Sequence, residues 1–310
     1  MQKGGVGVFD SGIGGLTVLN ECQKLLPDTL FYYYGDNNHA PYGNRSVKEI
    51  ERLTNKAFRL FRRLKVKAVV IACNTVTAVC IDRLRKRYPF PIIGTEPAVL
   101  SAAKKGGEIF ALTTRATFES ERFRALCSLA QKRYPQARIT PYACDGLAGE
   151  IERCLNYTDS DFSRFLPQGK PSSVVLGCTH YVYIKEVVQR FYSCDVMDGN
   201  YGVATRLSAV LQAVNKDNSL QKRQKNRDLQ PHLTTMYKKG KEANKCLCFN
   251  AQKNGKNSKE QNVIFLGKSR KINEIQYEQM FVVKDGCDMV NYGAKVVKKP
   301  KKIKKILKKY

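Results

Sequence analysis

From residue 5 to about residue 214, short apolar runs alternate with longer amphipathic segments of helical length. One such segment is "SVKEIERLTNKAFRLFRRL" (46–64), whose apolar residues recur every three or four positions and fall on one stripe of a helix. Short runs rich in Val, Ile, Phe and Tyr predict strands. The predicted strands cover residues 6–9, 30–34, 68–72, 91–93, 108–112, 137–142, 172–177 and 195–197.

This alternation predicts an α/β fold in which parallel strands are covered by helices. Strands buried on both faces appear as continuous apolar runs, as "VVIA" (69–72) and "VVLG" (174–177) do. Ligands of such sheets bind outside the carboxyl ends of the strands. Polar residues that directly follow a strand are therefore the first candidates for chemistry.

Two of the strands run into a cysteine: Cys73 is followed by Asn74 and Thr75, and Cys178 by Thr179. A thiol at a strand-to-helix junction lies near the positive end of the helix dipole, which favours the thiolate. The neighbouring Thr and Asn side chains can donate hydrogen bonds to a carboxylate or to the sulfur. The alternative interpretation is that Cys73 and Cys178 are only small buried residues at the ends of strands, without a chemical role. The repetition of the pattern favours chemistry.

The first strand ends at Asp10, and Ser11 and three glycines follow in "DSGIGG". Glycines permit close approach of a ligand to the backbone. The spacing differs from G-x-G-x-x-G, and a carboxylate before the turn would repel a pyrophosphate, so a dinucleotide site is disfavoured. A carboxylate at this place suits a base or the orientation of an ammonium group; the alternative is a helix N-cap.

A long polar loop, "YGDNNHAPYGNRS" (34–46), follows the second strand. Pro41, Tyr42 and Gly43 restrict its shape and leave a glycine amide available. Backbone N–H groups of this kind can hold an anionic group. The loop is therefore a candidate part of a binding site.

The net charge of +27 is concentrated towards the C-terminus, where residues 216–310 hold 25 Lys and Arg against 8 Asp and Glu. Nine lysines lie in the last sixteen residues. Three interpretations of 295–310 stay open: a solvated tail, contact with nucleic acid through phosphates, or a basic amphipathic helix on an anionic membrane. Polar stretches at 215–232 and 250–262 predict loops, and 263–267 and 280–283 predict short strands.

The eleven cysteines are scattered, and we interpret most of them as buried thiols rather than a disulfide framework. With only three histidines, none beside a cysteine pair, no metal site is expected. His180 stands out because it is two residues from Cys178. No apolar run approaches the roughly 20 residues of a membrane-spanning helix, and no secretory signal is visible, so we expect a cytoplasmic protein.

Four motifs, "FDSGIGGL", "GDNNHAPYGNRS", "ACNT" and "GCTH", resemble those of the glutamate racemases in the aspartate/glutamate racemase family, in the same order and over residues 5 to about 212. The resemblance implies two similar parallel-sheet half-domains with helices on both faces, an active site in the cleft between them, and here a basic C-terminal extension. The expected division is 1–97 with about 200–230, 98–199, and a partly disordered Lys-rich extension over 231–310.

The resemblance also implies interconversion of L- and D-glutamate without a cofactor, which supplies D-glutamate for peptidoglycan; we expect a homodimer. Racemisation removes the α-proton from one face of the substrate and returns a proton to the other. Two acid/base groups must therefore face each other across it. By resemblance, Cys73 acts on D-glutamate and Cys178 on L-glutamate.

Further residues take roles by the same resemblance. Asp10 and His180 would adjust the protonation of the thiols, and His180 suits this because its charge changes near neutral pH. Glu152 in "DGLAGEIE" matches an assisting glutamate, with Glu150 kept open. The implied substrate-binding residues are Asp10, Ser11, Pro41, Tyr42, Gly43, Asn74, Thr75, Thr117, Thr179 and His180, with Thr114 as a weaker companion of Thr117.

Two other functions remain to be weighed. A sister racemase acting on aspartate or another acidic amino acid would share these motifs. A nucleic-acid-binding protein built on a racemase-like core would explain the charge of the C-terminal region. Members of the family usually finish soon after the last core helix, with a short segment that packs back on the core, whereas here nearly a hundred residues follow Val214. Residues 263–281 are a candidate for that displaced segment.

Overall fold

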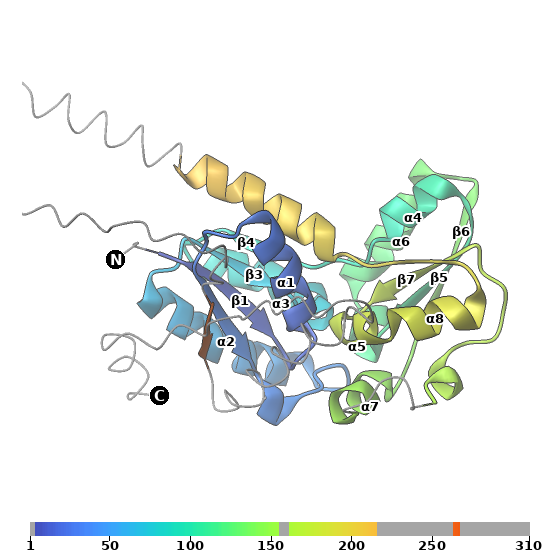
Figure 1. Cartoon of the computed structure of the whole chain (residues 1–310), viewed down its shortest axis with the longest axis horizontal. Helices are drawn as coiled ribbons and strands as arrows, with labels where there is room; N and C mark the ends of the chain where they lie inside the picture. The colour runs from blue at the N-terminus through green and yellow to red at the C-terminus, as the bar shows by residue number, and fades with distance from the viewer. Residues whose placement is uncertain (1–3, 155–160, 216–262, 267–310) are drawn as a thin grey trace, which may run out of the picture.

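The computed structural model describes residues 4–154, 161–215 and 263–266, which form two lobes, each built around its own parallel sheet (Figure 1). The strand order is β4-β3-β1-β2-β9 in the first sheet and β6-β5-β7-β8 in the second. All eight predicted strands of the core are confirmed. The first sheet contains β1 (Val6–Asp10), β2 (Phe31–Gly35), β3 (Ala68–Ile71), β4 (Ile92–Gly94) and β9 (Val263–Leu266), and the second contains β5 (Gly107–Thr113), β6 (Ala137–Ala143), β7 (Ser173–Gly177) and β8 (Asp195–Met197).

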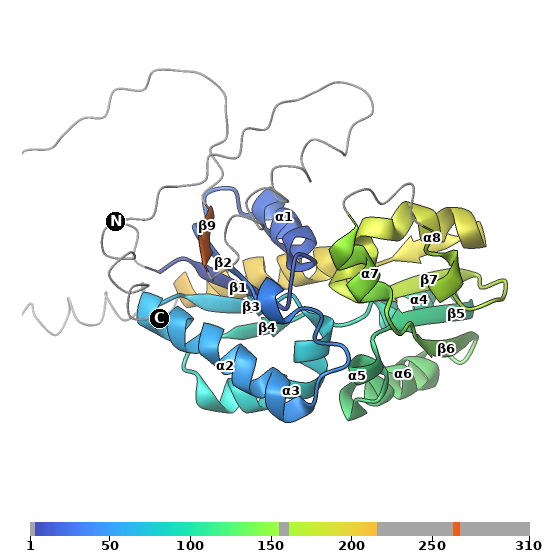
Figure 2. The ribbon, with the colours of Figure 1, turned by 90° about the horizontal axis from the view of Figure 1, so that it is seen from below.

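Helices cover both faces of the first sheet, and Figure 2 shows α1 on the opposite side from α2 and α3. Successive strand residues alternate between the two core layers: Phe9 packs with α2 and α3, and Val8 packs with α1. Each layer is closed by buried apolar side chains. The helices are α1 (Gly15–Leu25), α2 (Val47–Leu64), α3 (Asn74–Arg87) and a helix over residues 200–215.

The second sheet is enclosed in the same way. Leu112 packs with one layer of helices and Ala111 with the other, which is again the alternation of a strand that is buried on both faces. The first layer contains α7 (Leu147–Arg153), η3 (Thr179–Ile184) and α8 (Lys185–Tyr192), and the second contains α4 (Val99–Lys105) and α6 (Glu121–Arg133). Short helices at η1 (Asn37–His39), α5 (Arg115–Phe118) and η2 (Ser163–Phe165) complete the described elements.

Helix α2 confirms the amphipathic segment predicted at 46–64. Ser46 caps its N-terminus by accepting a hydrogen bond from the Glu49 N–H at 3.3 Å. Ile50, Leu53 and Phe61 on its apolar stripe are buried against the first sheet. The helix therefore follows from local capping and from the burial of one face.

The chain passes from the first lobe to the second after β4 and returns after β8 (Figure 1). The returning helix, over residues 200–215, buries Val203, Ala204 and Leu207 with α1 against the first sheet. Among the described helices, none is long and apolar enough to cross a membrane. The eight described cysteines are all free thiols, as predicted, and five of them are buried.

Strand β9 completes the first sheet at its β2 edge, which confirms the strand predicted at 263–267. It runs parallel to β2, with Phe265 in register with Tyr33 and their ring centroids 5.8 Å apart. Residues 263–266 therefore lie in the first sheet, although the predicted division grouped them with the extension over 231–310. The strand predicted at 280–283, the polar stretches at 216–232 and 250–262, and the tail over 295–310 fall outside the described residues.

Candidate active site

The two cysteines singled out by the sequence lie at the carboxyl ends of β3 and β7, one in each lobe. Cys73 is the N-cap residue of α3, and Cys178 precedes η3. Both are buried, with exposed fractions of 4% and 6%. They are close enough that the charge of Cys178 contributes to the pKa of Cys73. Two buried thiols from separate sheets thus lie within electrostatic range of each other.

Cys73 lies in a setting that keeps it protonated. Burial raises the pKa of the Cys73 thiol to about 12, and the Asp10 carboxylate raises it further, while hydrogen bonds with Ser11 and the Val76 backbone oppose the change. Its Sγ donates to Ser11 Oγ at 3.5 Å. The N–H of Val76 at the helix terminus favours the thiolate of Cys73, as predicted, but desolvation outweighs this effect and the net shift is towards the thiol. The group is positioned as an acid.

Cys178 has a cation beside it instead. Its Sγ lies 3.8 Å from His180 Nδ1, and the Nε2 of the same ring is hydrogen-bonded to Glu152 Oε2. Burial alone would lower the pKa of His180, but the Glu152 carboxylate and Cys178 raise it well above its usual range. The contact with Glu152 therefore favours the imidazolium form of the ring, whose Nδ1–H can donate towards the sulfur of Cys178. The two thiols thus have chemically different surroundings.

The carboxylate of Glu152 also receives hydrogen bonds from the first lobe. Asn37 Nδ2 donates to its Oε1 at 3.2 Å, and the Ile13 N–H donates to its Oε2 at 3.4 Å. Gly12 lies so close that a Cβ there would be 2.7 Å from the carboxylate oxygens. Glu152 therefore joins the histidine of one lobe to the turn after β1 of the other.

Glu150, the alternative kept open by the sequence, points elsewhere. Its carboxylate pairs with Arg153 and, at 3.5 Å, with Arg164. Both arginine side chains are largely exposed. The structure thus places Glu152, and not Glu150, against His180.

We expect Glu152→Gln to lower the activity implied by the sequence resemblance by about 10- to 100-fold at neutral pH. Without the carboxylate, burial dominates and the pKa of His180 falls, so the imidazolium persists only at lower pH. The pH dependence of kcat/KM should therefore move towards acid in this variant. Glu150→Gln is the matched control and should leave both the rate and the pH profile unchanged; equal effects in the two variants would contradict the assignment.

Asp10 is fully buried at the end of β1 in the first lobe, and its carboxylate is hydrogen-bonded to a residue of the second lobe. Its Oδ1 accepts the Gly12 N–H at 2.9 Å, and its Oδ2 accepts the Thr179 hydroxyl at 3.2 Å. Burial raises the pKa of Asp10 to about 6, an effect partly offset by the charge of His180. A Cβ on Gly15 would lie 2.4 Å from the Asp10 Cβ, so only glycine permits this approach.

Threonines from both lobes meet across the cleft. The Oγ1 atoms of Thr75 and Thr114 are 2.9 Å apart, and Thr114 Oγ1 donates to Thr117 Oγ1 at 3.1 Å. Thr114, predicted only as a weaker companion, lies between the other two. The carbonyl of Gly43 accepts the Ala116 N–H at 3.1 Å, which brings the polar loop of the first lobe to the same place.

Within the polar loop, the side chain of Tyr42 turns into the first lobe. The Tyr42 ring is buried in the first-lobe core near Phe9, and its hydroxyl donates to Asp36 Oδ2 at 2.7 Å. The contribution of Tyr42 to a binding site stays a prediction. Beside the threonines a pocket opens between the lobes, lined by Pro41, Gly43 and Asn44 from the first and by Thr114, Cys144 and Gly149 from the second.

Sequence reasoning missed two residues that hold the site together. Asn37 lies in the quoted polar loop, but nothing in the sequence singled it out as a partner of Glu152. Tyr33 was interpreted only as part of a strand; its fully buried hydroxyl donates to the Gly12 carbonyl at 2.7 Å and fixes the turn after β1. Over the described ranges, no group of three His, Cys, Asp or Glu side chains is arranged to hold a metal ion.

Tyr33→Phe should lower the free energy of unfolding by about 1–2 kcal/mol, because the buried Gly12 carbonyl loses its donor. The turn that carries Asp10 should loosen, so kcat/KM should fall several-fold. Chemical denaturation and steady-state kinetics measure the two effects. The control is Tyr32→Phe, since this ring packs on the opposite face of the sheet; the same loss of activity there would show that the effect is not specific to the turn.

Comparison with known proteins identifies relatives of the chain. A sequence profile described as Asp/Glu/Hydantoin racemase matches residues 16–206. A glutamate racemase of Clostridium botulinum (strain Kyoto / Type A2) is 40% identical over 222 residues, which are 68% of this chain and 84% of the relative. A glutamate racemase of Clostridium perfringens (strain SM101 / Type A) is 35% identical over 235 residues, covering 72% and 89% of the two chains.

Solved structures are similar as well. The glutamate racemase isoform RacE1 from Bacillus anthracis superposes with a TM-score of 0.60 at 28% identity, over 69% of this chain and 83% of that chain. The Escherichia coli glutamate racemase, solved in complex with L-glutamate and the activator UDP-MurNAc-Ala, gives a TM-score of 0.59 at 27% identity over 68% and 83%. The similarity extends over both lobes and leaves about a third of this chain without a counterpart.

Proposed function

The chain belongs to the Asp/Glu/Hydantoin racemase family, and from this relationship we propose that it is a glutamate racemase, an isomerase that interconverts L- and D-glutamate. The observation that supports the proposal is the pair of buried cysteines at the carboxyl ends of two strands, one in each lobe: burial raises the pKa of Cys73, and His180, whose own pKa is raised, lies beside Cys178. Racemisation requires one acid and one base at the same time. The product, D-glutamate, is in this family a building block of peptidoglycan.

The two directions of reaction use the cysteines in opposite roles. With L-glutamate, the Cys178 thiolate takes the α-proton and Cys73 gives its own proton to the other face of the carbanion. With D-glutamate, Cys73 is the base and Cys178 the acid. The arrangement with Cys73 protonated is ready for L-glutamate, because burial and Asp10 keep that thiol neutral. His180, paired with Glu152, places a positive charge beside Cys178, whereas Asp10 places a carboxylate near Cys73.

The substrate carboxylates need hydrogen-bond donors. Hydroxyl groups of Thr75, Thr117 and Thr179, the amide of Asn74 and the backbone of Pro41–Gly43 supply them around the cleft. Donors at the α-carboxylate stabilise the negative charge that develops when the proton leaves, and they act strongly because these side chains are buried. These groups perform the proton transfer and charge stabilisation without help from a cofactor in this proposal.

Aspartate is the competing substrate, since it carries the same groups on a chain that is one methylene shorter. One missing methylene typically changes kcat/KM by only about 10- to 200-fold. The alternative of a nucleic-acid-binding protein rests on the charge of the C-terminal region and is not favoured by the relatives. The homodimer and a contact of 295–310 with anionic membrane or nucleic acid stay predictions.

Circular dichroism of L-glutamate solutions tests the proposal. Purified full-length protein, with no added cofactor, should bring the signal to zero from either enantiomer, since the equilibrium constant between enantiomers is one. L-aspartate is measured in parallel. Decay with aspartate alone would assign the protein to the sister activity, and constant signals with both amino acids would contradict a racemase of acidic amino acids.

A further inference from the structure

The two chain segments that connect the lobes lie against each other. They are residues 95–98, between β4 and α4, and residues 198–200, after β8; we call them together the hinge. A Cβ on Gly199 would be 2.5 Å from the carbonyl oxygen of Glu96, so the two segments are in direct contact. The orientation of one lobe relative to the other is therefore set over a narrow region.

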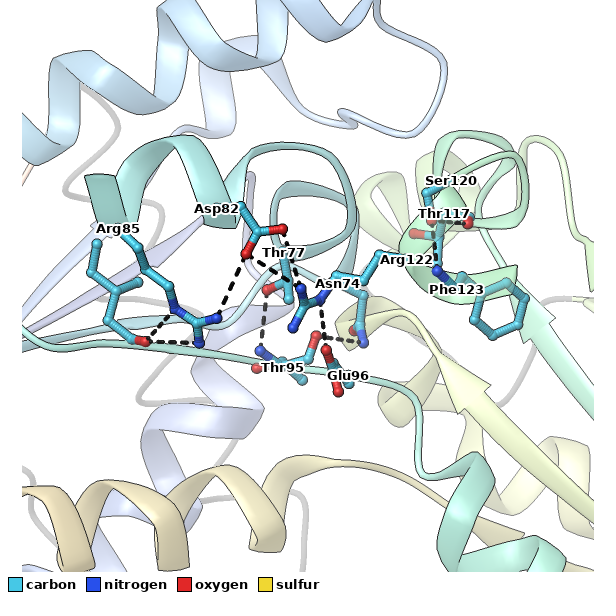
Figure 3. Close-up of polar contacts among 11 residues, drawn as sticks. Asn74, Thr77, Asp82, Arg85, Thr95, Glu96, Thr117, Ser120, Arg122 and Phe123 are labelled. Carbon is cyan, nitrogen blue, oxygen red and sulfur yellow. Dashed lines mark hydrogen bonds and ion pairs between the residues drawn. The ribbon is translucent and has the colours of Figure 1, made fainter. Parts of the chain in front are cut away.

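Arg122, in the first turn of α6 in the second lobe, reaches across this region to the first lobe (Figure 3). Its Nε donates to Glu96 Oε1 in the hinge at 2.6 Å. Its second contact is with both carboxylate oxygens of Asp82 on α3, at 3.4 and 3.5 Å. One guanidinium thus joins the second lobe, the hinge and the first lobe.

The same network continues to residues on both walls of the cleft. On the first wall, the Asn74 amide donates to the carbonyl of Thr95, the neighbour of Glu96, at 3.3 Å (Figure 3). On the second wall, the Ser120 hydroxyl donates to the Thr117 carbonyl at 2.7 Å and caps the helix that carries Arg122. Asn74 and Thr117 are both proposed substrate contacts.

We propose that Arg122 is a positioning residue that holds the two walls of the cleft at the separation glutamate requires, an inference that rests on the proposed function. Its side chain is 32% exposed, and those of Glu96 and Asp82 are 40% and 70% exposed. Ion pairs of this kind contribute little to global stability. The small free energy of these ion pairs can still favour the spacing of the two walls at which the substrate binds. It then changes the fraction of protein molecules that are ready to bind substrate, and so changes KM.

Arg122→Gln in the full-length protein tests the proposal. We expect the KM of both enantiomers to rise about fivefold, kcat to stay within about twofold, and the melting temperature to stay close to that of the wild type. Because the equilibrium constant is one, kcat/KM must fall equally in both directions. Arg122→Lys, which keeps the charge, should recover part of the affinity.

Two further variants make the test specific. Glu96→Gln should reproduce the rise in KM, and combining it with Arg122→Gln should add little, because both remove the same contact. Arg124→Gln is the control: this side chain, on the same helix, donates to the Glu119 carbonyl within its own lobe at 2.9 Å, and KM should not change. An equal rise in KM in the control, or additive effects in the double variant, would overturn the proposal.

Hydrogen exchange gives a readout that does not depend on racemisation. In Arg122→Gln the backbone amides of residues 95, 96 and 98 should exchange several-fold faster than in the wild type, whereas strands of both sheets should not change. Unchanged exchange at these amides, with KM within about twofold of the wild type, would overturn the role of Arg122. Faster exchange in a protein that does not racemise glutamate would retain that role and reject the proposed function.

Discussion

Replacing either Cys73 or Cys178 by serine should lower glutamate racemisation by about 10²- to 10⁴-fold and leave the fold intact. Serine is almost the same size, but its hydroxyl is a far weaker acid than a thiol. Each face of the α-carbon has its own proton carrier, so neither cysteine can replace the other. Chiral analysis of the product measures the rate, and far-UV circular dichroism verifies the fold.

The control for this test is Cys194→Ser, because Cys194 is half-buried at the edge of the second-lobe core and its sulfur donates to the carbonyl of its neighbour Asp195. It should retain full activity. A near-normal rate in either active-site variant, with an unchanged fold, would remove that thiol from the mechanism.

Solvent exchange in D₂O should also separate the roles of the two thiols. Cys178→Ser retains Cys73, so it should incorporate deuterium into D-glutamate faster than it produces L-glutamate. Cys73→Ser should do the same for L-glutamate. The reverse pattern would exchange the assignments of the two cysteines.

Asp10→Asn should make the protein more stable at neutral and alkaline pH and much less active. The folded pKa of Asp10, about 6, lies above its ordinary value of 3.8, so the folded state binds this proton more tightly than the unfolded state does. The stability linked to this proton is fully present below about pH 4 and is lost as the pH rises through 6. The buried charge therefore costs on the order of 3 kcal/mol at pH 8, since each pKa unit corresponds to about 1.4 kcal/mol.

The asparagine variant avoids this cost. Its amide oxygen can still accept the Gly12 N–H, and its amide nitrogen can donate to the Thr179 hydroxyl, so both neighbours keep a partner. The proposed proton transfer at Cys73 loses the adjacent carboxylate, and activity should fall about 100-fold.

Urea denaturation of wild type and variant between pH 4 and pH 8 measures the difference. It should be smallest at pH 4, grow as the pH rises to about 6, and then level off. A wild type that is more stable than Asp10→Asn at pH 8 would show that the ionised carboxylate is stabilising in the fold.

The strands of both sheets could be predicted because residues such as Val8 and Phe9 are buried on opposite faces and produce continuous apolar runs. The site could be located because parallel sheets bind ligands at their carboxyl ends, where Cys73 and Cys178 stand. The choice between Glu150 and Glu152 could not be made. Two residues apart on a short helix, they point in different directions, and only packing shows which direction faces His180.

The protonation state of Cys73 could not be predicted from the sequence either. A helix terminus favours a thiolate, but the extent of burial, which decides the balance, depends on how Cys73 packs in the first-lobe core. Arg122 could not be identified from the sequence for a similar reason. Its partners lie on α3 and in the hinge, and both are distant from it along the chain.

Strand β9 has a consequence for synthesis of the protein on the ribosome. Its partner β2 is the aromatic segment "FYYYG", and that edge has unpaired backbone groups until residues 263–266 have been made. Open edges of this composition are ready templates for pairing between chains. A chain that has not yet been extended to residue 263 therefore presents an unpaired strand edge at β2, and the pairing with β9 is what removes this site of aggregation.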